Sequence, residues 1–115
     1  DVCVVGAGIA GLTTAYLLQK EGKSVIVLDA WDMAAGETCR TTAHLTAVLD
    51  DRFFHLESLF GEDGARLAAE SHMAAVNRIE AIVREEGIDC DFERVDGYLA
   101  ALDDKQHEDF DKEAE

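Results

Sequence analysis

Three glycines near the start of the chain have the spacing of a loop that binds a diphosphate. They belong to the string Gly6-Ala7-Gly8-Ile9-Ala10-Gly11, which fits Gly-x-Gly-x-x-Gly. In such a string the first glycine permits a tight turn and the second lets a pyrophosphate approach the backbone. The third lets a helix pack closely on a strand. Because glycine and alanine are common residues, the meaning of the string depends on the residues and elements around it.

A carboxylate further along the chain complements these glycines. Asp29 follows the apolar run at residues 24–28 and stands 18 residues after Gly11. An acid at this place accepts hydrogen bonds from the hydroxyls of an adenosine ribose. It repels a 2′-phosphate, and residues 29–39 contain no arginine, so NADP is disfavoured. The alternative is a glycine turn that binds nothing, with Asp29 merely ending a strand.

The elements that must position these residues are predicted to form a β-α-β unit. Residues 2–5 and 24–28 are short apolar runs rich in β-branched side chains, which is typical of buried strands. Residues 9–21 carry apolar side chains near helical spacing, and Gly22 supplies a stop. Such a unit forms a parallel pair of strands with a right-handed crossover. The predicted fold class is therefore α/β, with a Rossmann-like dinucleotide-binding fold.

The rest of the chain is predicted to be helical and then to form a hairpin. Helices are expected over residues 50–60 and 64–86, with Gly61 between them. The dipeptide Asp96-Gly97 is a strong signal for a two-residue turn between strands at 90–95 and 98–102. From Asp103 the pattern resembles the start of another helix. The chain begins inside its first strand and stops in mid-pattern, so we expect it to be the N-terminal part of a longer polypeptide.

Composition and charge argue against several classes of function. Among the 115 residues, 25 acids outnumber 10 bases, and the formal net charge is −15. A hydrophobic fraction of 48% is too high for a disordered chain, and the acidic charge argues against nucleic-acid partners and anionic membranes. The three cysteines are widely spaced and form no Cys-x-x-Cys pair, so we expect no metal site and a reducing, cytoplasmic location.

The segment after Asp29 indicates which dinucleotide is bound. It reads Gly36-Glu37-Thr38-Cys39-Arg40-Thr41-Thr42-Ala43-His44-Leu45. With this string the chain resembles the FAD-dependent glycine and D-amino-acid oxidase (DAO) superfamily, whose cofactor domain is of the glutathione-reductase type. The resemblance runs through essentially the whole chain, including Glu86-Gly87-Ile88-Asp89 and Asp96-Gly97-Tyr98-Leu99. The string at 36–45 looks most like the subset that carries a Rieske [2Fe–2S] domain at the far C-terminus.

The resemblance implies a set of FAD contacts along the first part of the chain. The glycine string would line the pyrophosphate, the acid and its neighbour would meet the adenosine ribose, and the later loop would follow the pyrophosphate–ribityl side. The residues concerned are Gly6, Ala7, Gly8, Ile9, Ala10, Gly11, Asp29, Ala30, Thr38, Arg40, Thr41 and Thr42.

Several of these contacts have a plainer alternative. Arg40 is a natural partner for a diphosphate, but a surface salt bridge to Asp32 or Glu37 is the other interpretation. Thr41 and Thr42 are as well explained by hydrogen bonds within their loop. Some members of the family attach FAD through a histidine of this loop, and Arg40 stands at that place, so the resemblance implies non-covalent FAD. We expect His44 to have a structural role.

The resemblance implies an FAD-dependent oxidoreductase that oxidises the C–N bond of an amine or amino acid by hydride transfer to flavin N5. Residues 1–49 would be the FAD-binding unit with its loop, 50–88 a helical segment, and 89–115 the start of the substrate domain. Catalytic residues and any [2Fe–2S] centre would lie in later parts of the polypeptide. That remainder of the polypeptide would also be a partner of this chain. An NAD-dependent dehydrogenase domain and a non-catalytic nucleotide-binding module are the alternatives.

Overall fold

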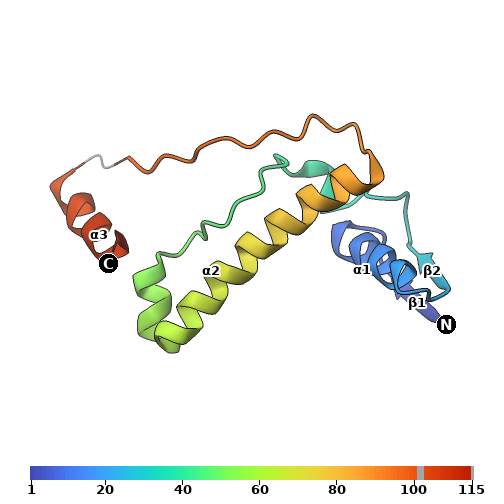
Figure 1. Ribbon diagram of the computed structural model, residues 1–115, viewed down its shortest axis with the longest axis horizontal. Coiled ribbons are helices and arrows are strands. Elements are labelled where there is room, and N and C mark those ends of the chain that lie inside the picture. Colours follow the sequence, from blue (N-terminus) through green and yellow to red (C-terminus); the bar gives the residue numbers. More distant parts are fainter. Residues whose placement is uncertain (101–102, 115) are drawn as a thin grey trace. The chain divides into compact units, whose positions relative to one another are not determined.

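The computed structural model describes residues 1–100 and 103–114, and it divides the chain into two compact units, Asp1–His44 and Leu45–Glu115. The first unit has the elements of a β-α-β motif followed by one turn of 3-10 helix. The second has a long helix and a short one. In chain order the elements are β1 (Val2–Val5), α1 (Ile9–Lys20), β2 (Val25–Leu28), η1 (Glu37–Arg40), α2 (Phe53–Glu86) and α3 (Asp104–Ala114) (Figure 1).

The first unit confirms the predicted α/β class with a parallel pair of strands. β1 pairs with β2 in parallel, with Val2 opposite Val25 and Val5 opposite Leu28. α1 packs against both strands. Side chains alternate along each strand between half-buried and exposed, so helix α1 covers one face of the pair. The prediction of strands buried on both faces is therefore wrong for this two-stranded sheet: Val5 is 84% exposed.

Glycines set both ends of α1. Gly8 precedes the helix in an extended conformation, and Leu12 donates the first intrahelical hydrogen bond to its carbonyl at 2.9 Å. At the other end Gly22 has a φ of 80°, which an L side chain rarely adopts, and it turns the chain back toward β2. The helix thus starts at the glycine string and stops where the sequence predicts.

In the second unit α2 contains the predicted break. Its backbone is non-helical at Gly61, where φ is 75° and ψ is 167°, so two helices meet there at a kink. The second helix ends at Gly87, a left-handed residue with a φ of 62°, as in a Schellman-type cap. Near the start of the second helix the Asp63 carboxylate pairs with the Arg66 guanidinium.

The predicted hairpin around Asp96-Gly97 is wrong for the described residues. Residues 91–100 contain no regular strand, and Gly97 is not among the glycines with positive φ that a two-residue hairpin turn needs. A lone hairpin is marginal without a third strand or a helix against it, and here Val95 and Tyr98 are 76% and 89% exposed. Residues 101–102 of the second predicted strand lie outside the described residues.

The helix expected after Asp103 is present as α3, and an Asp103 carboxylate oxygen accepts the Gln106 amide at 2.9 Å.

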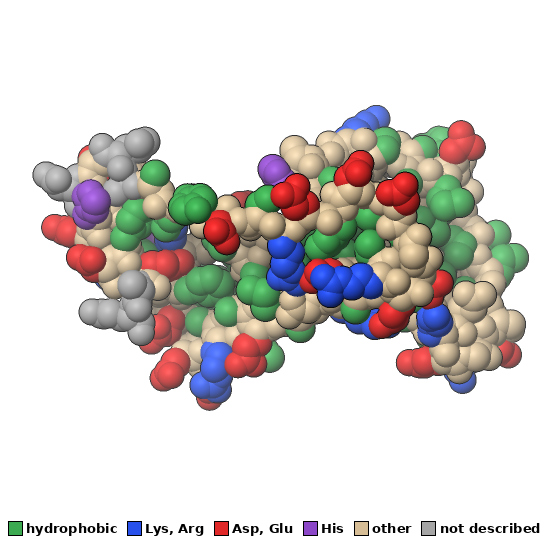
Figure 2. All heavy atoms as spheres, turned by 45° about the horizontal axis from the view of Figure 1, so that its top comes forward, with side chains coloured by type: hydrophobic (Ala, Val, Ile, Leu, Met, Phe, Trp, Pro, Cys, Tyr) green, Lys and Arg blue, Asp and Glu red, His purple; other side chains and the backbone are tan. Residues whose placement is uncertain are grey.

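Few side chains are buried in either unit. Among the described residues the buried hydrophobic side chains are Ala7, Ala15 and Ala65, while many larger ones are exposed. Figure 2 shows such hydrophobic side chains at the surface between the charged ones. All three cysteines, Cys3, Cys39 and Cys90, are exposed free thiols. In residues 1–100 and 103–114 no helix is both long and apolar enough to cross a membrane.

Candidate cofactor-binding site

The glycine string forms the turn between β1 and α1, and two of its glycines are required by the backbone itself. Gly6 has a φ of 106°, and its amide donates to the Leu28 carbonyl at 2.7 Å, which ties the turn to the end of β2. A Cβ on Gly11 would lie 1.9 Å from the Gly6 carbonyl oxygen, so no side chain fits there. The close helix-to-turn packing predicted for Gly11 is confirmed by this geometry.

Gly8 is crowded by a side chain from a later segment. A Cβ on Gly8 would lie 3.2 Å from the Thr38 hydroxyl oxygen, closer than an ordinary van der Waals contact. The same Oγ1 accepts a hydrogen bond from the Ile9 amide at 3.0 Å. Thr38 belongs to η1, so the start of α1 is joined to the loop that follows β2.

Asp29 also holds the glycine turn. One carboxylate oxygen accepts the Ala7 amide at 2.5 Å, and the other accepts the Trp31 amide at 2.9 Å. These bonds, Ala7 first, lower the pKa of Asp29 below its ordinary value of 3.8, and partial desolvation opposes them. Asp29 is therefore ionised at neutral pH. Neither partner was predicted from the sequence, since a main-chain amide can belong to any residue type.

The residues of this turn fit the diphosphate and ribose of a dinucleotide. The first turn of any helix leaves amides without an intrahelical acceptor, and in α1 these are the amides of Gly8, Ala10 and Gly11 beside the capped Ile9. They carry the positive end of the helix dipole toward the glycine string. A Cβ on Gly6 would meet nothing within 4 Å, so the turn is open on that side. The Asp29 carboxylate retains lone pairs for ribose hydroxyls beyond its two amide partners.

The later part of the predicted FAD loop, residues 40–42, contributes none of the hydrogen bonds described above for the glycine turn. Arg40 makes an ion pair with Glu37 at 3.2 Å, and the two side chains are 70% and 90% exposed. This is the surface salt bridge that the sequence left open as an alternative. Thr41 accepts the Ala43 amide at 3.3 Å, a hydrogen bond within the loop. Ala30, Thr42 and His44 are exposed.

The structure thus brings the glycine string, Asp29 and Thr38 together. Contacts of Ala30, Arg40, Thr41 and Thr42 with a cofactor stay a prediction. Ala34 is a participant that the sequence did not indicate: its amide donates to the Ala7 carbonyl at 3.0 Å, and its φ of 58° is unusual for a residue with a side chain. Only a run of small residues, Ala34-Ala35-Gly36, would have signalled a tight turn there.

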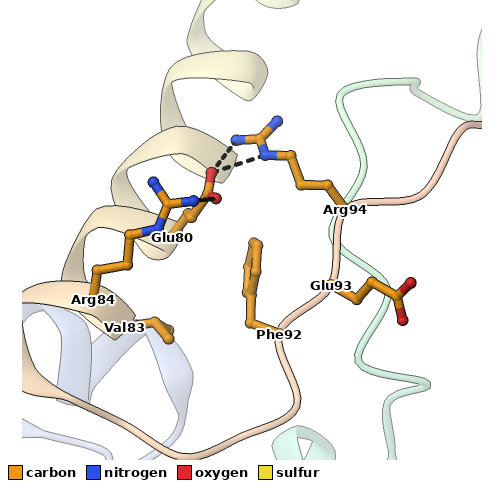
Figure 3. Close-up of a pocket in the computed structure, with 6 residues that line it drawn as sticks. All are labelled: Glu80, Val83, Arg84, Phe92, Glu93 and Arg94. Atoms are coloured by element: carbon orange, nitrogen blue, oxygen red, sulfur yellow. Dashed lines mark hydrogen bonds and ion pairs between the residues drawn. The ribbon is translucent and has the colours of Figure 1, made fainter.

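A second cluster of charged side chains lies in the other unit and has a structural explanation. A hollow of about 400 Å³ lies where residues 92–94 pass α2 (Figure 3). Arg94 and Arg84 both bind the Glu80 carboxylate, at 2.6 Å and 2.5 Å. The Arg94 hydrogen bond is the main cause that lowers the pKa of Glu80 below its ordinary 4.5. Phe92 points into the hollow and Glu93 points away from it, so the cluster fastens the extended segment to the helix.

Across the described residues, no group of three or more His, Cys, Asp or Glu side chains is placed to hold a metal ion.

Comparison with known proteins places the chain in a family. Residues 1–115 match the family of FAD dependent oxidoreductases known as DAO. The chain is 40% identical over 99 residues to the putative Rieske 2Fe-2S iron-sulfur protein YhfW of Bacillus subtilis, an alignment that covers 86% of this chain and 19% of that protein. It is 33% identical over 106 residues to the gamma-glutamylputrescine oxidoreductase of Escherichia coli, covering 92% and 25%. It is 29% identical over 110 residues to the probable oxidoreductase OrdL of Haemophilus influenzae, covering 95% and 25%.

These alignments span about a fifth to a quarter of the length of each relative. No solved structure matches the chain significantly. The glycine turn, the aspartate that holds it and the match over all 115 residues agree with one another. The chain belongs to the family of FAD dependent oxidoreductases.

Proposed function

We propose that this chain supplies the FAD-binding part of an oxidoreductase that acts on an amine or amino acid. The observation that carries the proposal is the glycine turn held by Asp29 at the N-terminus of α1. Three of the related proteins are a gamma-glutamylputrescine oxidoreductase, a flavin-containing amine oxidase and a D-amino acid dehydrogenase, which supports the substrate class. When bound, FAD supplies an acceptor for hydride from the carbon beside the substrate nitrogen.

In this proposal the chain binds and orients the adenosine diphosphate portion of FAD. The amides at the start of α1 donate to the diphosphate, and the open side of Gly6 leaves room for it. The ionised Asp29 carboxylate accepts hydrogen bonds from the ribose hydroxyls while it keeps Ala7 in place. β1, α1 and β2 are then the beginning of a larger Rossmann-like sheet.

Arg40 contributes to the diphosphate site in the same proposal. An exposed ion pair such as Arg40–Glu37 is worth little, because both groups are well solvated. The guanidinium can therefore exchange Glu37 for a phosphate oxygen at small cost, and it offers a planar pair of donors that suits phosphate. An arginine forms no covalent bond to a flavin, so we propose that FAD is held non-covalently, with Thr41, Thr42 and Ala30 beside it.

The remaining proposals concern the whole protein. The name of the Bacillus subtilis relative assigns a Rieske 2Fe-2S centre to that protein. We propose that any such centre in the present protein belongs to another part of the polypeptide. The three exposed free thiols support a reducing compartment, and we propose the cytoplasm. The substrate is a small molecule rather than a nucleic acid, in keeping with the net charge of −15.

The substrate class is tested by mixing the full protein, loaded with FAD, with primary and secondary amines and amino acids without oxygen. We expect at least one of them to bleach the visible flavin bands, and the matching alcohols or hydroxy acids to leave them unchanged. Bleaching by hydroxy acids alone would contradict an amine substrate. Bleaching by no compound, with the flavin still reducible by dithionite, would favour a non-catalytic nucleotide-binding module.

A further inference from the structure

We propose that residues 88–94 form a strap that Arg94 latches to α2 and that opens while the helix stays folded. The strap begins where α2 ends, at Gly87, and reaches back to the Glu80 carboxylate on the same helix (Figure 3). Helix and strap both belong to the second unit. The inference therefore goes beyond the proposed FAD site and is tested independently of it.

The latch joins one side chain of the strap to two side chains of α2. Arg94 donates from Nε to a Glu80 carboxylate oxygen at 2.8 Å and from Nη2 to the Asn77 side-chain oxygen at 2.6 Å. Asn77 and Glu80 are three residues apart and are neighbours on one face of the helix, so one planar guanidinium reaches both. The Glu80 side chain is 13% exposed, and water therefore weakens this ion pair less than it weakens a pair at the open surface.

Beyond the latch, one apolar side chain of the strap is shielded from water. Phe92 is half-buried and points into the hollow beside Val83 (Figure 3), whereas the other side chains of residues 88–94 are exposed. Residues 88–94 belong to no helix or strand, so no ladder of main-chain hydrogen bonds has to break when the strap moves. The contacts of Arg94 and the ring of Phe92 thus provide most of the attachment.

Two residues of unusual backbone conformation supply the hinges. Gly87 has a φ of 62° and ends the helix, and the Ile88 amide donates to the Val83 carbonyl at 2.9 Å there. Asp91 has a φ of 52°, which aspartate tolerates better than most residues with side chains do. Hinges are a few loop residues or element ends that absorb a change in φ and ψ. Gly87 and Asp91 meet this description, and residues 92–94 are the part that moves.

Arg84 makes the open state accessible. The second Glu80 carboxylate oxygen accepts from Arg84 Nη2 at 2.5 Å. Breaking a shielded ion pair by removing one partner is costly when it leaves the other charge unpaired. Here Arg84 is one turn further along the same helix and stays beside Glu80 when the strap leaves, while Arg94 goes out into water. A carboxylate shared by two arginines therefore gives the strap two states, in both of which Glu80 is paired.

Cleavage by chymotrypsin after Phe92 in the full protein measures the population of the open state, because the closed strap holds this ring against the helix. Arg94→Gln removes the latch. We expect it to make this cleavage roughly five- to thirtyfold faster, the range for hydrogen bonds to a charged group with allowance for partial exposure. Rates are divided by those of a peptide of residues 86–98 with the same substitution. A rate that Arg94→Gln leaves unchanged would overturn the latch.

Arg78→Gln is the matched control for this experiment. Arg78 lies on the same helix and pairs with Glu85 at 3.1 Å, and both side chains are about half exposed. This pair does not involve the strap, so the same substitution should leave the cleavage rate within about twofold of the wild type. A rate raised as much as in Arg94→Gln would show that any loss of charge on α2 loosens the strap and would overturn the specific role of Arg94.

Arg84→Gln distinguishes a strap with two states from a fixed attachment. Without Arg84, release of Arg94 leaves Glu80 unpaired, so we expect cleavage after Phe92 to become roughly threefold slower or more. A fixed attachment to which both arginines contribute would instead be weakened. Cleavage that is faster than in the wild type, or unchanged, would overturn the role of Arg84 in the open state.

Hydrogen exchange tests whether α2 stays folded when the strap opens. The amides of residues 65–83 should exchange equally fast in Arg94→Gln and in the wild type, and faster exchange along this stretch would overturn the inference. Should Arg94→Gln fail to fold, salt replaces it. Raising sodium chloride from about 0.05 to 1 M screens the ion pair and should speed the cleavage of the wild type after Phe92, but not that of the peptide. Equal effects of salt on the protein and the peptide would contradict the latch.

Discussion

At the scale of single residues, Asp29 does more than the sequence indicates. Its position after the second strand predicts a contact with a ribose, and the structure adds bonds to the Ala7 and Trp31 amides. A main-chain amide leaves no mark on a sequence, so these partners were not predictable. The same holds for Thr38: the family resemblance implies a cofactor contact for it, while its hydrogen bond to Ile9 depends on how two distant segments meet.

We expect Asp29→Ala to weaken FAD binding by about ten- to a hundredfold, because it removes a charged acceptor from the ribose and releases the Ala7 amide. Asp32→Ala is the matched control: an exposed acid of the same loop that makes no predicted cofactor contact. Titration of the apoprotein with FAD measures both. An Asp29→Ala protein with wild-type affinity would remove Asp29 from the site.

The same residue gives a defined dependence on pH. Because its amide bonds lower the pKa of Asp29 below 3.8, its contribution to folding is present above that value. The contribution is lost as the pH falls through the lower pKa of the folded state. The difference in unfolding free energy between wild type and Asp29→Asn should therefore be constant near neutral pH and shrink only in strong acid. A difference that shrinks already between pH values of about 5 and 7 would contradict this assignment.

At the scale of elements, glycine marks several of the boundaries that were predicted correctly. Gly22 and Gly87 end α1 and α2 in left-handed conformations, and Gly61 breaks α2 where a new helix was expected. The hairpin failed although Asp96-Gly97 is a strong local signal. A hairpin needs neighbours to bury one face, and the described residues offer none to Val95 and Tyr98. Local residue preferences thus predicted the glycine turns around α1 and the helix ends. Contacts between distant segments decided whether the strands formed.

Gly87 provides the test at this scale. We expect Gly87→Ala to destabilise the protein by about 1–2 kcal/mol, because an alanine is strained at a φ of 62°. Gly36→Ala is the control, since a Cβ at either position meets nothing within 4 Å and only Gly87 has a positive φ. Urea unfolding of the two variants compares them directly. Equal stabilities would show that the end of α2 relaxes without cost.

At the scale of the whole molecule, the first unit presents an uncovered sheet face. The alternation that places Val2, Val4 and their β2 partners toward α1 leaves Val5, Ile26 and Leu28 exposed by half or more. Parallel sheets are normally covered on both faces. The alignments reach across a fifth to a quarter of each relative's length. The α/β class and the family could be predicted from the sequence, whereas the exposure of this face could not be predicted from the apolar runs of the two strands.

The central claim is that the glycine turn of this chain holds FAD, and the visible spectrum of the purified full protein tests it most directly. The protein should be yellow, with flavin absorption bands that pass entirely into the supernatant after acid or heat precipitation. That result would establish a bound flavin and its non-covalent attachment together. A colourless protein that takes up no FAD on reconstitution but binds NAD tightly would contradict the claim.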